Sequence, residues 1–263
     1  MRVRGIELAY DDEGAGLPVV LLHGYPFNRS MWREQVEALA PGYRVIAPDL
    51  RGHGQTEPTA DEPATMQEMA LDVAALLDEL GLKRVTLCGL SMGGYVALAF
   101  HQKFPLRVRS LVLADTRAGA DTEDARRGRE EQALKVLKEG MRSIADGFIQ
   151  KVLTPETINT RPEIVTRVRR MITGTNPQGA ANALRGMALR RDYTESLPGI
   201  VSPTLIIVGS RDKITPPEEA GLLHREIRGS RLEVITGAAH LSNLERPAEF
   251  NRALKLFLDA QQP

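Results

Sequence analysis

The sequence predicts an α/β fold built on a mostly parallel, doubly wound sheet. Short apolar runs rich in β-branched residues recur along the chain, segments with helical spacing separate them, and most runs show no polar alternation. Parallel strands are covered on both faces and therefore read as continuous apolar runs. Their alternation with helices is typical of a doubly wound sheet. The runs lie at residues 19–22, 45–46, 85–87, 111–113, 205–208 and 232–235.

The N-terminal part of the chain predicts one hairpin and one well-delimited helix. Residues 2–10 alternate in polarity, which favours a hairpin at the edge of the sheet. Apolar positions then repeat with helical spacing from 66 to 80. Thr65 and Glu68 form a capping box at the start of this helix, and Gly81 supplies its end.

Two further helices are expected near the C-terminus. Thr215 and Glu218 form a second capping box, and Pro216 suits the first turn of a helix that runs to about 227. A third helix begins near Pro247. Its apolar residues recur every three or four positions and form one face, as in a surface helix that packs on the sheet.

The region 116–197 interrupts this alternation because it contains no strand-like run. We expect an all-helical insertion there, within a core formed by residues 1–115 and 198–263. Prolines 155, 162 and 177 punctuate the expected helices. These helices lie around 124–138, 141–153, 163–172 and 178–189.

Length and composition are those of an ordinary globular protein. Of the 263 residues, 42% are apolar and 26% are charged. The 34 Lys and Arg balance 34 Asp and Glu, so no global field exists to hold nucleic acid or an anionic membrane, and neither partner is expected. The longest apolar run has six residues, far below the ~18 of a membrane span. The single cysteine, Cys88, cannot form an intrachain disulfide, and residues 1–5 do not resemble a secretory signal. These features predict a cytoplasmic protein.

A nucleophile motif follows the predicted strand 85–87. The sequence Gly89-Leu90-Ser91-Met92-Gly93 has the pattern G-x-S-x-G and leads directly into an apolar helix. In this setting a sharp turn exposes the Ser91 hydroxyl group above the sheet, and the flanking glycines avoid collisions. A simple connecting turn and a phosphate loop are the alternatives. The second needs a lysine after the glycines, which is absent.

A serine nucleophile needs a base, and His240 is the best candidate. It follows the strand 232–235 through a loop of small residues, at the expected end of the sheet. His101 and His224 fall on predicted helices, whereas His23 and His53 fall in glycine-rich loops where a structural role is more plausible.

The orienting carboxylate is expected to be Asp212, which follows the strand 205–208. The chain order Ser91, Asp212, His240 then matches that of a known hydrolase arrangement. Asp115, after the strand 111–113, is the main rival, and Asp49 is the second. A turn or helix cap is the structural alternative for Asp212.

An oxyanion hole requires two backbone donors. The amide of Met92, just after the nucleophile, is one candidate. The loop His23-Gly24-Tyr25-Pro26 supplies the other, and Tyr25 is preferred because proline has no N–H. The Tyr25 ring can also pack in the pocket.

Five motifs occur in the order found in the α/β-hydrolase superfamily, and the chain resembles that superfamily over essentially its whole length. The motifs are His23-Gly24-Tyr25-Pro26, Asp49-Leu50-Arg51-Gly52-His53-Gly54, Gly89 to Gly94, Gly209-Ser210-Arg211-Asp212 and Ala239-His240. Ser91-Met92-Gly93-Gly94 and the run from His240 to Glu245 are most similar to the small carboxylesterase, enol-lactonase and cofactor-free haloperoxidase (perhydrolase) group. The resemblance implies an α/β-hydrolase fold with a helical cap over a catalytic triad.

The function implied is cleavage of a small carboxylic ester or lactone through an acyl-enzyme on Ser91, with Asp212 and His240 completing the triad. No metal or organic cofactor is needed. A carbon–carbon bond hydrolase, a perhydrolase and a ligand receptor with vestigial hydrolysis are the alternatives. Perhydrolases of this group commonly carry Trp where Tyr25 stands, which weakens that alternative. Dehalogenases and epoxide hydrolases carry Asp in place of Ser91 and are disfavoured.

Substrate preference is expected to lie in the cap. Residues 140–191 contain nine Lys or Arg and three acidic residues, a local charge of +6. This excess could guide an anionic substrate, or it could be a solvated helix face. Cys88 is expected to be a packing residue. A homo-oligomer is compatible with the sequence, which does not fix acyl-chain length, the choice between ester and lactone, or the pathway.

Overall fold

A central sheet organises the computed structural model, which describes residues 1–261 apart from 59 and 61. Its strands are β3 (Tyr10–Glu13), β4 (Leu17–Leu22), β5 (Tyr43–Pro48), β6 (Val85–Leu90), β7 (Val108–Ala114), β8 (Thr204–Gly209) and β9 (Arg231–Ile235). Within the described residues the sheet has seven strands in the order β3-β5-β4-β6-β7-β8-β9. Neighbouring strands are parallel except β3 and β5, which are antiparallel. The predicted α/β fold with a mostly parallel sheet is confirmed.

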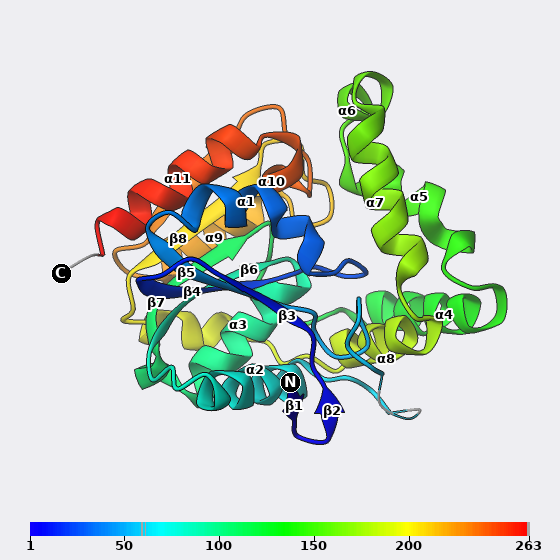
Figure 1. Ribbon diagram of the computed structural model, residues 1–263. Coiled ribbons are helices and arrows are strands. Elements are labelled where there is room, and N and C mark those ends of the chain that lie inside the picture. The colour runs from blue at the N-terminus through cyan, green and yellow to red at the C-terminus, as the bar shows by residue number, and fades with distance from the viewer. Residues whose placement is uncertain (59, 61, 262–263) are drawn as a thin grey trace.

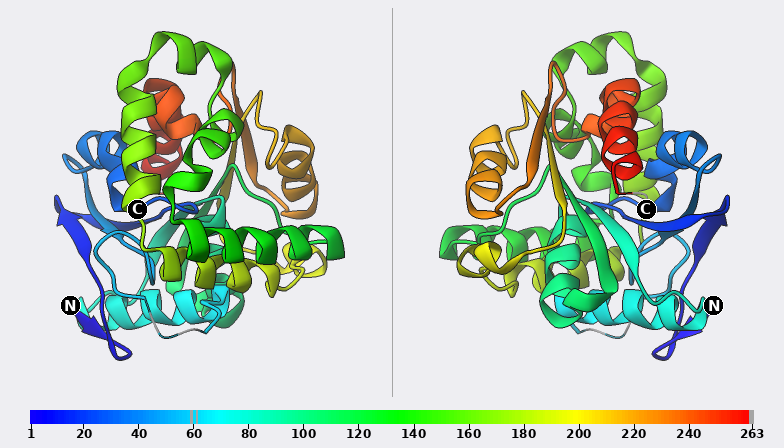
Figure 2. Two further views of the ribbon diagram at one scale, coloured as in Figure 1. Left: turned by 90° about the vertical axis from the view of Figure 1, so that its right-hand side faces the viewer. Right: turned by 90° about the vertical axis from the view of Figure 1, so that its left-hand side faces the viewer.

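Helices cover both faces of this sheet (Figures 1 and 2). One face carries α1 (Arg33–Leu39) and α11 (Pro247–Asp259), and the other carries α2 (Met66–Glu79), α3 (Met92–Lys103) and α9 (Pro217–Glu226). Every residue of β6 and β8 is buried between the two layers. Short helical turns complete the core: η1 (Arg29–Trp32), η2 (Pro105–Arg107), η3 (Thr194–Gly199) and α10 (Ser242–Glu245).

The capping predictions had different outcomes at α2 and α9. Thr65 caps α2 by accepting a 3.1 Å hydrogen bond from the amide of Glu68, and Gly81 lies after the helix with φ +67°. The capping box predicted for α9 is wrong. That helix begins at Pro217 without a side-chain cap. The hydroxyl group of Thr215 donates instead to the carboxylate of Asp212 at 2.7 Å, because a buried carboxylate is the stronger acceptor.

The N-terminal hairpin is real, but it does not lie at the edge of the main sheet. Strands β1 (Arg2–Val3) and β2 (Ile6–Glu7) pair with each other in a separate two-stranded sheet. Arg4 holds this hairpin to α2 through an ion pair with Asp72 at 3.1 Å. The main sheet ends at β3 on one side and at β9 on the other. The acidic residues of β3 conceal its strand character in the sequence; Asp12, for example, pairs with Arg44 at 2.7 Å.

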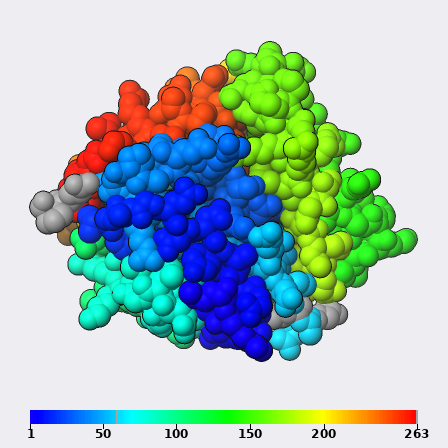
Figure 3. Space-filling view, in the orientation of Figure 1, coloured from blue at the N-terminus to red at the C-terminus, as the bar shows by residue number. Residues whose placement is uncertain are grey.

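A helical cap is inserted between β7 and β8. It consists of α4 (Glu123–Glu139), α5 (Arg142–Val152), α6 (Pro155–Thr160), α7 (Pro162–Gly174) and α8 (Pro177–Ala188). The three prolines that punctuate the sequence each start a helix, where a missing N–H costs nothing. The cap stands beside the core in Figure 1 and forms one flank of the surface in Figure 3. Among the described helices, none has the length and apolar character to cross a membrane.

Candidate active site

The G-x-S-x-G motif forms a sharp turn between β6 and α3. Ser91 has φ +54° and ψ −113°, a conformation that costs a non-glycine residue about 1–3 kcal/mol. Gly89 and Gly93 make the turn possible. A methyl group on Gly93 would collide with the carbonyl oxygen of Leu22, and one on Gly89 would collide with that of Gly93. The tight turn therefore holds the serine side chain above the ends of the strands.

Three residues far apart in the sequence form a continuous hydrogen-bonded row beside this turn. Nε2 of His240 lies 2.9 Å from Oγ of Ser91, and Nδ1 of His240 lies 2.8 Å from Oδ2 of Asp212. Asp212 and His240 are each 3% exposed, whereas Ser91 is partly exposed. The arrangement can therefore pass a proton from a serine hydroxyl to an imidazole whose other nitrogen faces a carboxylate.

The carboxylate of Asp212 is held by its own loop. Oδ1 accepts from the amides of Ile214 at 2.8 Å and Thr215 at 3.1 Å, and Oδ2 accepts from the Thr215 hydroxyl group. Burial by itself would raise the pKa of Asp212. The facing His240 and the hydrogen bonds from His240 and Thr215 outweigh burial and hold this pKa below its ordinary value. Asp212 is therefore arranged to stay ionised.

The rival carboxylates have other partners. Asp115 accepts from the amide of Gly209 at 2.8 Å and from the hydroxyl group of Ser242 at 2.5 Å. Burial, followed by the charge of Asp212, raises the pKa of Asp115 well above its ordinary value. Asp49 accepts from the side chain of Arg29. Of the three carboxylates, Asp212 is the one that meets Nδ1 of His240, so the geometry favours Asp212 over both rivals.

The other histidines pack within the core or on its surface. Nε2 of His23 accepts a 2.9 Å hydrogen bond from the amide of Leu50. Burial lowers the pKa of His23 to about 4, and burial followed by the charge of His23 lowers that of His53 to about 3, so both are neutral at pH 7. Burial also lowers the pKa of His101. Nδ1 of His224 lies 2.9 Å from Oγ of Ser230.

The two predicted oxyanion-hole residues lie next to the nucleophile. Met92 is the first residue of α3, so its amide has no carbonyl acceptor within the helix. Tyr25 lines the same small cavity as Ser91. Its hydroxyl group is buried and has no hydrogen-bond partner in the described part of the chain. Burial raises the pKa of this phenol far above the physiological range, so it stays protonated.

The cavity over Ser91 has a volume of about 80 Å³ and lies between the core and the cap. The cap contributes three apolar side chains, one amide and one guanidinium group, and the core contributes Tyr25, Ser91, Tyr95, Ile214 and His240. The cap residues in its wall are Arg129, Gln132, Phe148, Leu184 and Met187. This composition suits a small acyl group with one polar end.

Sequence reasoning missed Arg129, which reaches the cavity from α4. Its side chain pairs with Asp121, a carboxylate that Arg117 and Arg190 also approach at 2.8 and 2.6 Å. Burial would raise the pKa of Asp121, but hydrogen bonds and charge from Arg129 and Arg190 hold it below its ordinary value. Nη1 of Arg129 donates to Sδ of Met187 at 3.5 Å. Since a thioether is a weak acceptor, this guanidinium retains donor capacity toward the cavity.

Many of the basic residues counted in the region 140–191 have partners within the protein. Arg167 pairs with Glu34, Arg185 with Glu130, and Arg190 with Asp121, while Arg161 donates to a backbone carbonyl and Arg169 pairs with Asp146. The guanidinium in the cavity wall comes from α4, before this region. Arg129 lies among many charged residues of α4, so its sequence surroundings did not indicate a role in the cavity.

The described residues include one thiol and several side chains of the kinds that ligate metals. These residues contain no group of three or more His, Cys, Asp or Glu arranged to hold a metal ion. Cys88 is fully buried in β6, and burial raises the pKa of its thiol. A buried neutral thiol behaves as a packing group.

Comparisons with known proteins agree with this architecture. The chain is 34% identical over 230 residues to 3-oxoadipate enol-lactonase 2 of Acinetobacter baylyi, covering 87% of this chain and 83% of the relative. A thermophilic esterase from Thermogutta terrifontis, solved with malate bound, superposes with a TM-score of 0.97 at 42% identity, covering 100% and 97% of the two chains. The enol-lactonase from Burkholderia xenovorans superposes with a TM-score of 0.92 at 30% identity, covering 98% of each chain. Residues 18–247 match the family described as alpha/beta hydrolase fold. The protein therefore belongs to the α/β-hydrolase family, as its motifs predict.

Proposed function

We propose that the protein is a serine hydrolase that cleaves carboxylic esters or lactones through an acyl-enzyme intermediate. The observation that carries this proposal is the row of hydrogen bonds from Ser91 through His240 to Asp212, with distances of 2.9 and 2.8 Å. The similarity to esterases and enol-lactonases supports it.

The proposed reaction begins when His240 takes the proton of Ser91 as Oγ attacks the substrate carbonyl. Asp212 stabilises the imidazolium that forms, and the amides of Tyr25 and Met92 stabilise the oxyanion. His240 then protonates the leaving alcohol. Water repeats the same steps on the acyl-enzyme and releases the carboxylic acid.

The cavity wall favours a substrate whose acyl part carries a carboxylate. Arg129 offers a cationic donor, and the unpartnered hydroxyl group of Tyr25 offers a neutral one. Together they could hold an anionic group while Ser91 attacks the carbonyl. The Thermogutta esterase was solved with malate, a dicarboxylate, and the Acinetobacter relative is named for 3-oxoadipate, also a dicarboxylate, which supports this preference.

Other reactions on the same residues are distinguished by assay. A carbon–carbon bond hydrolase would cleave a diketone in preference to esters, and a perhydrolase would require peroxide as the acyl acceptor. A ligand receptor would turn over every ester and lactone far below the usual enzyme rate of ~10 s⁻¹. The similarity to an esterase and to enol-lactonases favours ester or lactone cleavage.

The decisive experiment compares the wild type with Ser91→Ala on p-nitrophenyl esters of increasing chain length and on simple and homoserine lactones. We expect hydrolysis of short substrates by the wild type only, and covalent labelling of Ser91 by a fluorophosphonate detected by mass spectrometry. Full activity of Ser91→Ala, or labelling at another residue, would overturn the proposal.

A further inference from the structure

A buried carboxylate joins the loop that carries His240 to the cap. Glu245, the last residue of α10, is 2% exposed, and its carboxylate forms hydrogen bonds with Ala239 and Thr154. One of its oxygens, Oε2, accepts a 2.6 Å hydrogen bond from the amide of Ala239, the residue before His240. This contact fixes the position of the backbone directly before His240.

The other oxygen of Glu245 binds the cap. Oε1 accepts from the amide of Thr154 at 2.8 Å and from its hydroxyl group at 2.7 Å, at the start of α6. The backbone carbonyl of Glu245 accepts from the guanidinium group of Arg161 at 2.7 Å. Both carboxylate oxygens and the backbone carbonyl of Glu245 thus accept hydrogen bonds. Such bonds offset the desolvation penalty of a buried carboxylate.

A second cap contact lies on the far side of the base. The amide of Leu241 donates to the carbonyl oxygen of Val152 at 3.2 Å. His240 is therefore flanked on each side by a backbone amide anchored outside the loop: Ala239 through Glu245, and Leu241 directly to the cap. The 2.9 Å separation of the base from Ser91 depends on a short loop whose position both anchors fix.

We propose that Glu245 is a positioning residue that couples the cap to the catalytic base: it fastens the His240 loop to Thr154 and so keeps Nε2 of His240 within reach of the nucleophile. This inference rests on the proposed hydrolase function. It assigns to the cap a part in catalysis itself, in addition to forming the substrate cavity.

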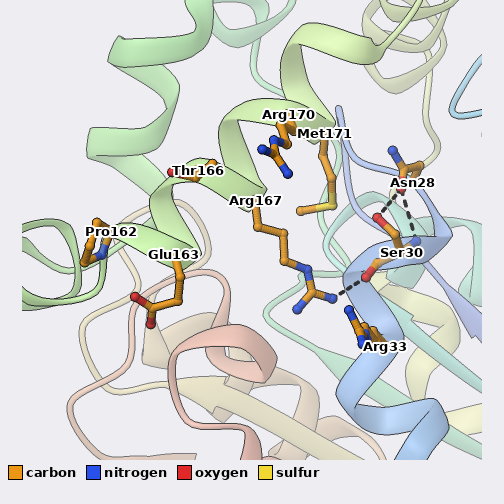
Figure 4. Close-up of a pocket in the computed structure, with 9 residues that line it drawn as sticks. All are labelled: Asn28, Ser30, Arg33, Pro162, Glu163, Thr166, Arg167, Arg170 and Met171. Atoms are coloured by element: carbon orange, nitrogen blue, oxygen red, sulfur yellow. Dashed lines mark hydrogen bonds between the residues drawn. The ribbon is translucent and has the colours of Figure 1, made fainter.

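Arg167 provides a matched control because it also bridges the cap and the core. Figure 4 shows it reaching from α7 to the carbonyl oxygen of Ser30, across a groove of about 650 Å³. It also pairs with Glu34 at the start of α1. This bridge does not involve the His240 loop. Loss of Arg167 weakens cap docking without touching the anchors of the base.

The test compares Glu245→Gln, Thr154→Val, Thr154→Ser and Arg167→Met with the wild type. In Glu245→Gln, the side-chain NH₂ group faces a backbone N–H that also donates, so one hydrogen bond is lost. Thr154→Val removes the hydroxyl group at similar side-chain volume, whereas Thr154→Ser retains it. We measure kcat and KM on a short p-nitrophenyl ester, the rate constant for fluorophosphonate labelling of Ser91, and the melting temperature.

For Glu245→Gln we expect kcat and the labelling rate to fall together by up to about a hundredfold with KM nearly unchanged, because small displacements of a catalytic group are that costly. Thr154→Val should show a smaller fall of the same kind, Thr154→Ser should restore it, and Arg167→Met should lose thermal stability while keeping the wild-type labelling rate.

Equal labelling rates in the wild type, Glu245→Gln and Thr154→Val would overturn the inference, as would an equal fall in Arg167→Met. If Glu245→Gln does not fold, the comparison of Thr154→Val with Thr154→Ser tests the inference instead. An inactive wild type would instead contradict the proposed hydrolase function, so the two failures are distinguishable.

Discussion

The hydroxyl group of Thr215 donates to Oδ2 of Asp212 at 2.7 Å, and the same oxygen faces Nδ1 of His240 at 2.8 Å. Thr215 thus contributes to the depressed pKa of Asp212, although it lies in a segment whose sequence predicts only a helix cap. It is a supporting residue for the ionised carboxylate.

Thr215→Val should therefore move the acid unfolding of the protein to higher pH. A carboxyl group whose folded-state pKa is depressed adds stability above its unfolded pKa of about 3.9, and that stability is lost as the pH falls through the folded-state pKa. Removing the hydroxyl donor raises the folded-state pKa toward the unfolded one. Urea unfolding between pH 7 and pH 3 measures this. Thr215→Ser, which keeps the donor, should follow the wild type, and a Val profile identical to it would contradict the role of the hydroxyl group.

Exchange of Asp212 for Asn should lower kcat by about 10⁴, because the amide favours the wrong imidazole tautomer. Asp115→Asn is the matched control. The carboxamide oxygen of that variant can still accept from the Gly209 amide, and its NH₂ group can donate to the hydroxyl oxygen of Ser242. We expect it to keep kcat within a few-fold of the wild type. The reverse ranking of the two variants in steady-state assays would assign the acid to Asp115.

The strained turn predicts a difference between two inactive variants. Ser91→Ala keeps a side chain at φ +54°, whereas Ser91→Gly removes the source of strain. We expect Ser91→Gly to be more stable than Ser91→Ala by about 1 kcal/mol, after the greater entropy of glycine in the unfolded chain is included. Chemical denaturation of both proteins measures this difference. A more stable alanine variant would show that the surroundings relieve the strain.

The cavity cation predicts selectivity for charged substrates. Arg129→Met should raise KM for a dicarboxylic acid monoester by about 10- to 100-fold, the effect of one charge-assisted hydrogen bond. It should leave the neutral ester of equal length nearly unaffected. Tyr25→Phe removes the second donor and should shift KM in the same direction by less. Arg170→Met, which changes a residue of the outer groove, is the control. Equal losses on charged and neutral esters would argue for a purely structural Arg129.

Local patterns in the sequence were sufficient for much of the fold. The Ser91 turn could be predicted because its glycines, the preceding apolar strand and the following helix are adjacent in the chain. The cap helices α7 and α8 could be delimited because prolines 162 and 177 each begin one. The short helix α6 and the acidic edge strand β3 were missed, since neither has an apolar run long enough to stand out.

The rest depends on contacts between distant segments. Arg129 belongs to a highly charged helix, and only the folded chain shows that its guanidinium group lines the same cavity as Ser91 and Tyr25. Glu245 lies just before α11, and the sequence at that point resembles the start of any amphipathic helix. Its partner Thr154 is 91 residues away, and no local spacing encodes that pairing.

Both ends of the cap leave the core at the same place. The amide of Tyr193 donates to the carbonyl oxygen of Ala118 at 3.1 Å, and the strands that precede and follow the cap, β7 and β8, are direct neighbours. Since closure entropy grows slowly with loop length, grafting a longer or shorter segment between these two residues disturbs the sheet little. A chimera should keep the catalytic activity of its core only when the grafted cap supplies an amide and a hydroxyl group that donate to Glu245, as Thr154 does.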